Sequence, residues 1–439
     1  MELFAPPEET IVGVSAESRS GRRSCRDVLE ACLGRIDARE AEVRAWVVID
    51  LEGARRQADR IDADRRAGRT LGPIAGIPVG IKDIIDVLGL PTAFGVPEAP
   101  GRAADDDAPI VAELRRRGAV ILGKTVSTPY AWVDTPPTRN PWNLDRTPGG
   151  SSSGSAAAVA CGMCLGALGS QTGGSITRPA SYCGVSGFKP TFGSRSLSGV
   201  LPLAPSLDHP GPIARTVGDL ALLADVRPGG TATPPTIGRL RGFFEDHATP
   251  AMRSAMDRVL ATLAEAGAIV VEVPLPDDFE DFAGHHYHLM AAEAAAFHRI
   301  DRGRHPERFP PRITRLIDDG LGLKAVDYLA ARRHRDRLRE ELLDRLPGVD
   351  AFATPAAPAA APGPETTGDP RFNSPWSLAG FPTVALPIAL DPDGLPLGLQ
   401  LVGRPGPGGE AGLFGVGIWC ESAVRRAAGA PELPPPGWP

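Results

Sequence analysis

Lysine is scarce in this chain, and one lysine stands where it could serve as a base. The sequence holds only Lys82, Lys124, Lys189 and Lys324, whereas arginine supplies nearly all other positive charge. A buried lysine can have its pKa lowered by several units and then accept a proton, which arginine cannot do at any working pH. Lys82 fits best, because strand alternation puts it on one face with Pro78 and Gly80. On this segment alone, an edge-strand lysine reaching water is the alternative.

Two glycine- and serine-rich segments add hydroxyl groups and backbone N–H groups. Residues 147–160 read Thr-Pro-Gly-Gly-Ser-Ser-Ser-Gly-Ser-Ala-Ala-Ala-Val-Ala, so serines crowd the N-terminus of an alanine-rich helix, where negative charge is favoured. Further on, Ser175 follows Gly173 and Gly174, which would let backbone N–H groups approach a substrate oxygen and form an oxyanion hole. Taken separately, a flexible linker and a tight turn explain these two segments as well.

The residues around these segments predict short strands and helices in alternation, which is typical of an α/β layered fold. Short β-branched runs at 77–85 and 119–122 are separated by a helical stretch at 109–117. Apolar residues spaced three and four apart predict helix over 25–67. Further helices are expected at 250–267 and 282–346, and further strands at 351–354, 381–390 and 397–402.

Composition indicates a globular protein and excludes several classes. Of the 439 residues, 42% are apolar and 23% are charged, as in ordinary folded proteins. The net charge is −6, and the sequence contains no concentrated stripe of basic residues. We therefore expect no nucleic-acid partner. The apolar run Ala156–Gly169 is shorter than the roughly 18 residues of a spanning helix, so no membrane partner is expected. Met1–Val12 shows no secretory signal, and the expected localisation is cytoplasmic.

The cysteines predict neither disulfides nor a metal site. Six cysteines are too scattered to form a disulfide framework in a chain of this length. Cys161 and Cys164 form one C-x-x-C pair, but no second pair or nearby histidine completes a zinc site. We therefore expect buried free thiols, no metal and no organic cofactor.

Two further motifs match the sequence, but the segments around them do not have the secondary structure that each motif requires. Gly118–Thr125 fits the phosphate-loop pattern, but 119–122 read as the strand, which should precede the first glycine. Gly150–Gly154 fits the nucleophile elbow of α/β-hydrolase esterases with Ser152 as nucleophile, but a proline-broken loop precedes it where a strand is required. An esterase would also need a histidine, and we expect surface helix for the candidates His285, His286, His288, His298, His305 and His334.

Together these segments resemble the amidase signature family, over about residues 20–425. That family combines a strand lysine, a glycine- and serine-rich stretch and a Gly-Gly-Ser loop. The matching motifs are Gly76–Gly95, Asn140-Pro-Trp-Asn, Cys183-Gly-Val-Ser-Gly-Phe-Lys-Pro-Thr, Asp350-Ala-Phe-Ala-Thr-Pro, Phe381-Pro-Thr-Val-Ala-Leu-Pro and Gly394-Leu-Pro-Leu-Gly-Leu-Gln-Leu-Val-Gly.

The resemblance implies a Ser-Ser-Lys triad and an acyl-enzyme. Ser175 would be the nucleophile, Ser151 the bridging serine after a cis peptide bond, and Lys82 the neutral base. Ser152 would support them through hydrogen bonds. The oxyanion hole would consist of backbone N–H groups of Thr172, Gly173, Gly174 and Ser175.

Two positions depart from the common family pattern. Gln171 stands where many members carry Asp, and Arg178 follows the nucleophile by three residues. This pattern resembles the malonamidase-type branch, in which that arginine binds a substrate carboxylate, as guanidinium geometry favours. We therefore expect a small carboxylate-bearing amide as substrate, with Arg178 and Gln171 in its binding site. An arginine that only pins a loop is the alternative.

The resemblance also implies the fold and leaves some functions open. We expect one α/β/α domain over 1–430, a mixed sheet covered by helices, with the motif core at 76–200, a variable helical segment at 230–345 lining the substrate entrance, and a Pro-rich tail at 431–439. The alternatives are the amidase subunit of a tRNA-dependent amidotransferase, an esterase and a non-catalytic binding protein. The oligomeric state stays open, with a homodimer as one option.

Overall fold

A computed structural model describes residues 2–96, 102–230 and 233–436. Its centre is a mixed 11-stranded sheet in the order β1-β5-β2-β6-β8-β7-β12-β13-β11-β9-β10. The expected α/β class with a large mixed sheet is confirmed. The strands of this sheet are β1 (Trp46–Ile49), β2 (Pro78–Lys82), β5 (Val120–Thr125), β6 (Gly166–Gln171), β7 (Ser186–Lys189), β8 (His209–Ala214), β9 (Thr236–Leu240), β10 (Ile269–Val273), β11 (Ala351–Pro355), β12 (Thr383–Leu390) and β13 (Pro396–Val402), and β3 (Pro91–Thr92) pairs separately with β4 (Arg102–Ala103).

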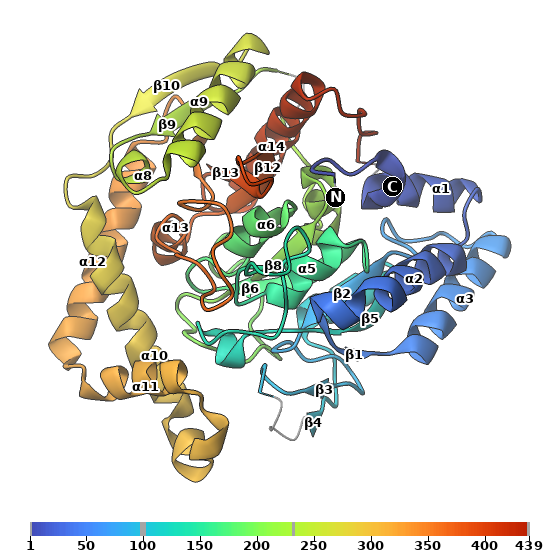
Figure 1. The fold of residues 1–439 in the computed structure, drawn as a ribbon, viewed down its shortest axis with the longest axis horizontal. Coiled ribbons are helices and arrows are strands. Elements are labelled where there is room, and N and C mark those ends of the chain that lie inside the picture. The colour runs from blue at the N-terminus through green and yellow to red at the C-terminus, as the bar shows by residue number, and fades with distance from the viewer. Residues whose placement is uncertain (1, 97–101, 231–232, 437–439) are drawn as a thin grey trace.

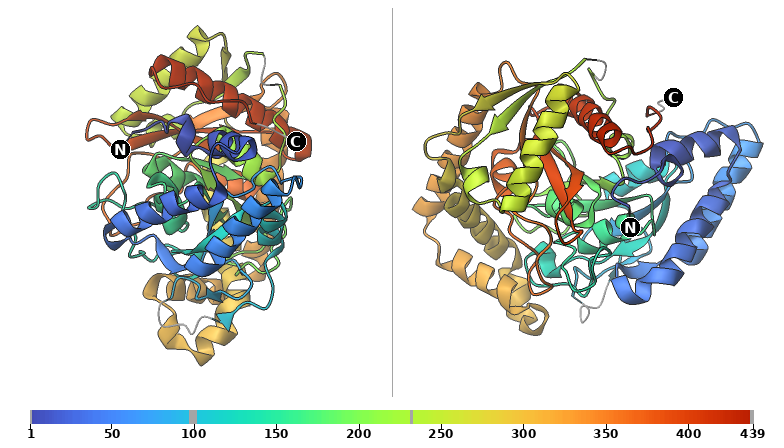
Figure 2. Two further views of the ribbon diagram at one scale, coloured as in Figure 1. Left: turned by 90° about the vertical axis from the view of Figure 1, so that its right-hand side faces the viewer. Right: turned by 45° about the horizontal axis from the view of Figure 1, so that its top comes forward.

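Helices surround this sheet on several sides (Figures 1 and 2). In Figure 1, α10–α12 lie on the side of the sheet opposite α1–α3. The helices are α1 (Ile11–Ser20), α2 (Cys25–Val43), α3 (Leu51–Arg66), α4 (Pro109–Arg116), α5 (Ser153–Ala160), α6 (Thr177–Cys183), α7 (Val217–Ala224), α8 (Phe243–Asp246), α9 (Pro250–Glu265), α10 (Phe282–Arg304), α11 (Pro311–Gly322), α12 (Ala325–Asp344), α13 (Ser374–Ala379) and α14 (Pro407–Ala427). Among the described residues, every helix is too short or too polar to cross a membrane.

Strand direction explains why distant motifs meet. β2 pairs in parallel with both β5 and β6, and Ile81 lies opposite Leu168. The carboxyl ends of parallel strands share one edge of a sheet, where ligand sites commonly form. Lys82 at the end of β2 and Ser170 near the end of β6 therefore reach the same edge.

Two parts of the chain differ from the expected elements. The predicted helix over 25–67 is interrupted by β1, because the β-branched run at 46–49 pairs antiparallel with β5. The segment 230–345 is not purely helical, since β9 and β10 extend the sheet at its far edge. Because one sheet connects β1 with β10, we propose that residues 1–430 fold as one domain.

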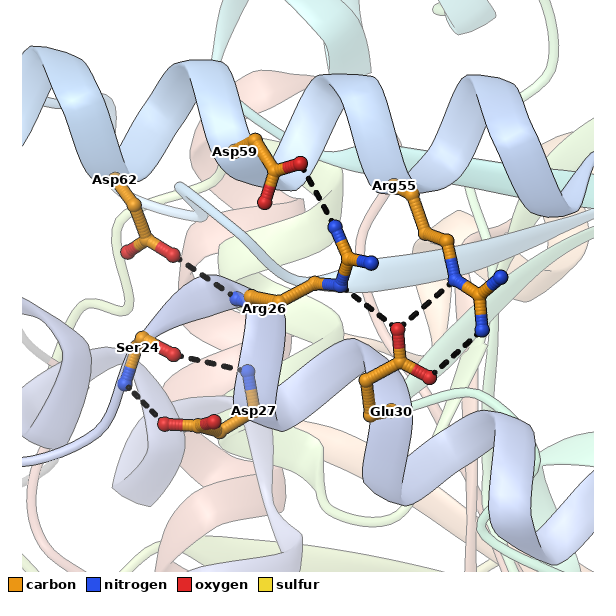
Figure 3. A network of polar contacts seen from close by, with 7 residues as sticks. All are labelled: Ser24, Arg26, Asp27, Glu30, Arg55, Asp59 and Asp62. Carbon is orange, nitrogen blue, oxygen red and sulfur yellow. Dashed lines mark hydrogen bonds and ion pairs between the residues drawn. The ribbon is translucent and has the colours of Figure 1, made fainter.

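The helices α2 and α3 are joined by a polar network (Figure 3). Ser24 caps α2 by accepting from the Asp27 backbone N–H, while the Asp27 side chain accepts from that of Ser24. Glu30 on α2 accepts from Arg55 on α3 at 2.9 and 3.0 Å. Arg26 donates to both Glu30 and Asp59, each at 2.7 Å. These contacts fix the helical pair that precedes the site.

Candidate active site

Lys82 is fully buried at the end of an interior strand. Its Nζ lies 2.7 Å from Ser151 Oγ and 2.8 Å from Ser170 Oγ. Burial lowers the pKa of Lys82 to about 7, although the nearby Asp208 carboxyl opposes the shift. Asp83 faces away and pairs with Lys124 at 3.3 Å. The alternative of an edge-strand lysine reaching water is therefore wrong, since β2 lies between β5 and β6.

The loop before α5 brings serines to the same place. The Gly150–Ser151 peptide bond is cis. A Cβ at position 150 would lie 2.8 Å from the Thr367 methyl group, so a larger residue there would force this neighbour to shift. Ser152 Oγ lies 3.2 Å from both the Ser170 carbonyl and the Ser170 backbone nitrogen. The Ser152 N–H also donates to the Ser175 carbonyl at 3.3 Å, which joins the two serine loops.

The loop 172–175 has its four carbonyls occupied and its four N–H groups free. The carbonyls accept, in chain order, from His286 Nε2 at 2.9 Å, Ser377 Oγ at 2.7 Å, the Arg178 N–H at 3.0 Å and the Ser152 N–H at 3.3 Å. Within the described residues, no acceptor is assigned to the N–H groups of Thr172, Gly173, Gly174 and Ser175. Four free donors on a loop held through its carbonyls can stabilise an oxyanion.

The hydroxyl of Ser175 faces the cavity and makes no hydrogen bond to the described residues. The second half of a relay, from Ser175 to Ser151, is therefore open in this structure. Such contacts are often long without substrate and tighten in the reacting complex.

Gln171 has a different environment from the one expected. Its side-chain oxygen accepts from the Ile176 N–H at 2.9 Å and the Thr177 N–H at 3.0 Å, and its amide donates to Ser377. The side chain is fully buried and does not line the cavity. These contacts do not support substrate binding by Gln171, and we propose that it positions the loop that leads into α6.

Arg178 on α6 lines the cavity and is 2% exposed. One terminal nitrogen, Nη2, donates to the Gly150 carbonyl at 2.7 Å and to Thr367 Oγ1 at 3.4 Å. The buried Nε and Nη1 atoms have no hydrogen-bond partner among the residues that the structure describes. Burial lowers the pKa of Arg178 from its ordinary value, but a guanidinium stays charged. Unpaired buried N–H groups favour an anionic ligand.

A cavity of about 450 Å³ opens onto Ser175 and Arg178. Its walls come from the loop after β6, from α8 and α10, and from the loop before α13. Apolar and aromatic side chains form part of the lining, and polar side chains come from Thr172, Ser175, Arg178, His247, Glu280, His286, Tyr287, Asp369, Arg371 and Ser374.

Three residues of this region were not predicted from the sequence. Ser170 contacts Lys82 from the neighbouring strand, and the spacing within each strand offered no signal for it. Asp208 is buried, accepts from Thr172 Oγ1 at 2.6 Å, and has its pKa raised to about 7 by burial. His286 lines the cavity and is 5% exposed, so the expected surface position is wrong for it, as it is for the buried His298 and His334.

The rejected motifs have structural roles. Lys124 of the phosphate-loop match is buried and contacts Asp83 and Thr92. Thr125 is the next residue of β5 and is also buried. Ser152 of the elbow match is buried against Ser170 and does not line the cavity. Among the described residues, no cluster of His, Cys, Asp or Glu could hold a metal ion.

Comparison with known proteins decides the family. The protein-family model described as Amidase matches residues 27–232 and 225–410 of this chain. The chain belongs to the amidase family.

The relatives extend over nearly the whole chain. A glutamyl-tRNA(Gln) amidotransferase subunit of Chloroflexus aggregans is 35% identical, over 97% of this chain and 98% of that protein. The AtzE subunit of the 1-carboxybiuret hydrolase of Pseudomonas sp. (strain ADP) is 35% identical, over 95% of this chain and 96% of that protein. A solved amidase structure superposes with a TM-score of 0.87 at 35% identity, over 94% of this chain and 99% of that one.

Family membership settles the class of reaction. This amidase is an enzyme that hydrolyses amide C–N bonds, so the non-catalytic alternative is not supported. The esterase of α/β-hydrolase type is excluded, because the fold and the family are those of amidases.

Proposed function

We propose that this amidase hydrolyses a carboxylate-bearing amide through an acyl-enzyme on Ser175, with Ser151 as relay and Lys82 as base. Neutral Lys82 takes the Ser151 proton while Ser151 takes that of Ser175, whose oxygen attacks the amide carbon. The C–N bond breaks, and the relay returns the proton to the departing amine. Water then repeats the sequence and releases the acid.

One observation carries this proposal. The buried Lys82 amine lies 2.7 Å from Ser151 Oγ and its pKa is lowered to about 7 by burial. A base with a pKa near the working pH combines a large neutral fraction with useful basicity. The free N–H groups of residues 172–175 supply the complementary donors for the oxyanion.

The carboxylate preference rests on Arg178. Its Nε and Nη1 atoms are buried, lack partners in the described part of the chain, and belong to a side chain that lines the cavity beside Ser175. A guanidinium can bind a carboxylate through two parallel hydrogen bonds. The name of the Pseudomonas relative, which belongs to a 1-carboxybiuret hydrolase, is in keeping with such a substrate. These observations support the part of the proposal that assigns this chain to the malonamidase-like branch.

Replacing Arg178 by glutamine should reduce the selectivity for carboxylated amides. Charge-assisted hydrogen bonds contribute about 1.5 to 3 kcal/mol, so kcat/KM for malonamate should fall roughly 10- to 100-fold relative to wild type. The kcat/KM for neutral propionamide should change much less. The ratio of the two values is the measurement, because Arg178 also donates to Gly150 and its loss can perturb both substrates alike. An unchanged ratio contradicts the role.

The glutamyl-tRNA(Gln) amidotransferase relative favours a second candidate, in which the chain is the amidase component of a larger assembly and delivers ammonia to a partner. Affinity purification of the tagged chain from its native cells distinguishes the two. A stoichiometric partner with tRNA-dependent transamidation supports this candidate. Full activity of the isolated chain on malonamate supports the first.

A further inference from the structure

The cavity is much larger than a small amide acid requires. Cavities of about 300 to 1,000 Å³ bind drug-sized ligands, and this one has a volume of about 450 Å³. Malonamate, with its single carboxylate, would occupy only the part near Ser175 and Arg178. The remaining space can hold a further substrate group. The proposed preference for a carboxylate does not say what this group is.

The cavity has one buried charge without a partner. Arg178 forms no ion pair within the described residues, whereas Arg371 is paired with Asp369 at 2.6 Å. Glu280, which also lines the cavity, is exposed to solvent. His286 has its pKa lowered by burial, so its ring is neutral. One carboxylate therefore balances the buried charge of Arg178, and the apolar part of the lining is left for the rest of the substrate.

The apolar part of the lining includes residues of α8 and α10. Phe282, His286 and Met290 are spaced four residues apart, so they lie along one face of α10. The His286 ring donates to the Thr172 carbonyl at 2.9 Å, which directs this face toward the nucleophile loop. Phe243 of α8 packs edge-on against Phe282, with ring centroids 5.6 Å apart.

The origin of each wall indicates which part of the substrate it holds. Arg178 lies on α6, directly after the nucleophile loop, so it can hold the acyl group that stays bonded to Ser175. The apolar face belongs to α10, a separate outer segment, where the departing amine can lie. Tyr287 on α10 donates to Asp319 of α11 at 2.5 Å, which holds this wall in place.

We propose that the preferred substrates are half-amides of short dicarboxylic acids whose nitrogen carries an apolar group of about benzyl size. This inference rests on the proposed function. The acyl carboxylate binds Arg178, and the apolar amine group packs between Phe243, Phe282 and Met290. Ser175 Oγ forms the ester, the C–N bond breaks, and the amine leaves with the serine proton. Water then releases the dicarboxylate.

Wild-type enzyme tests the inference with N-methylmalonamate and N-benzylmalonamate, which both release alkylamines. Burial of a benzyl-sized group should raise kcat/KM for the benzyl compound roughly 10- to 100-fold over the methyl compound. A benzyl compound that is no better than the methyl compound overturns the inference. Faster cleavage of N-(phenylacetyl)glycine, whose carboxylate lies on the amine side, overturns the assigned orientation.

A pair of methionine variants tests the wall itself. Met290→Ala should reduce the benzyl-to-methyl ratio of kcat/KM by about 3- to 10-fold, since it removes buried contact area. Met256→Ala is the matched control, because Met256 is 5% exposed and Met290 4%, but Met256 lies on α9 outside this cavity. An equal ratio in both variants contradicts the assignment. If no carboxylated amide is cleaved at all, the proposed function fails. If malonamate is cleaved without a benzyl advantage, only this inference fails.

Discussion

Replacing Ser175 with alanine is expected to lower kcat for amide hydrolysis by roughly 10⁴- to 10⁶-fold, because no acyl-enzyme can form. Ser175 is the only residue of the proposed triad that lines the cavity. Ser151 and Lys82 lie behind it, where they can serve a nucleophile but not attack a substrate. Rates for malonamate and binding of a non-hydrolysed analogue, measured on both proteins, should show a loss in kcat with little change in affinity.

Covalent labelling identifies the same residue independently. A fluorophosphonate probe should label the wild-type peptide that contains Ser175, and the Ser175→Ala enzyme should not react. Ser181→Ala is the control, since Ser181 lies on the adjacent α6, is buried, and its hydroxyl makes no hydrogen bond to any described residue. Labelling of Ser152 instead would support a nucleophile elbow and contradict the triad.

The sequence predicted the fold class and the strand that carries Lys82, because local pattern is informative where strands are apolar and β-branched. It missed β1, which is only four residues long between two helices. Apolar spacing on both sides of 46–49 resembles one continuous helix. The pairing with β5 that makes this run a strand is a tertiary contact, which local spacing does not contain.

The two glycine- and serine-rich segments stood out in the sequence because short runs of glycine allow tight turns with free backbone donors, although a linker and a turn explained each of them as well. Asp208 and His286 did not, since each contacts Thr172 from a segment distant in the chain. A usable signal did exist for His286. Phe282 and Met290 lie four residues on either side of it, and a polar residue within such an apolar stripe is expected to face the interior.

Gln171 is the opposite case. Its place in the motif suggested substrate contact, but hydrogen bonds of its side-chain oxygen to two backbone N–H groups explain its position without a ligand. A residue next to a nucleophile loop can be required for the shape of the loop alone. The sequence does not distinguish these two uses, because both need a buried amide at the same position.

Replacing Lys82 with methionine is expected to lower kcat/KM by roughly 10⁴-fold, the effect of losing a general base on which the relay depends. Methionine keeps an unbranched side chain of similar length in the buried site, so the fold should persist. Lys189→Met is the matched control. Lys189 is equally buried, but its amine donates to the Pro190 carbonyl and does not contact the serines.

Lys82→Arg separates proton transfer from charge and hydrogen bonding. Arginine can still donate to Ser151, yet it cannot release its proton at working pH, so this variant should be as inactive as Lys82→Met if the base must be neutral. The pH profile gives the second readout. Because the lysine acts only when uncharged, wild-type kcat/KM should rise with pH through about 7, the lowered pKa of Lys82. Substantial activity in Lys82→Arg, or the same rising limb in the residual activity of Lys82→Met, would assign the base to another group.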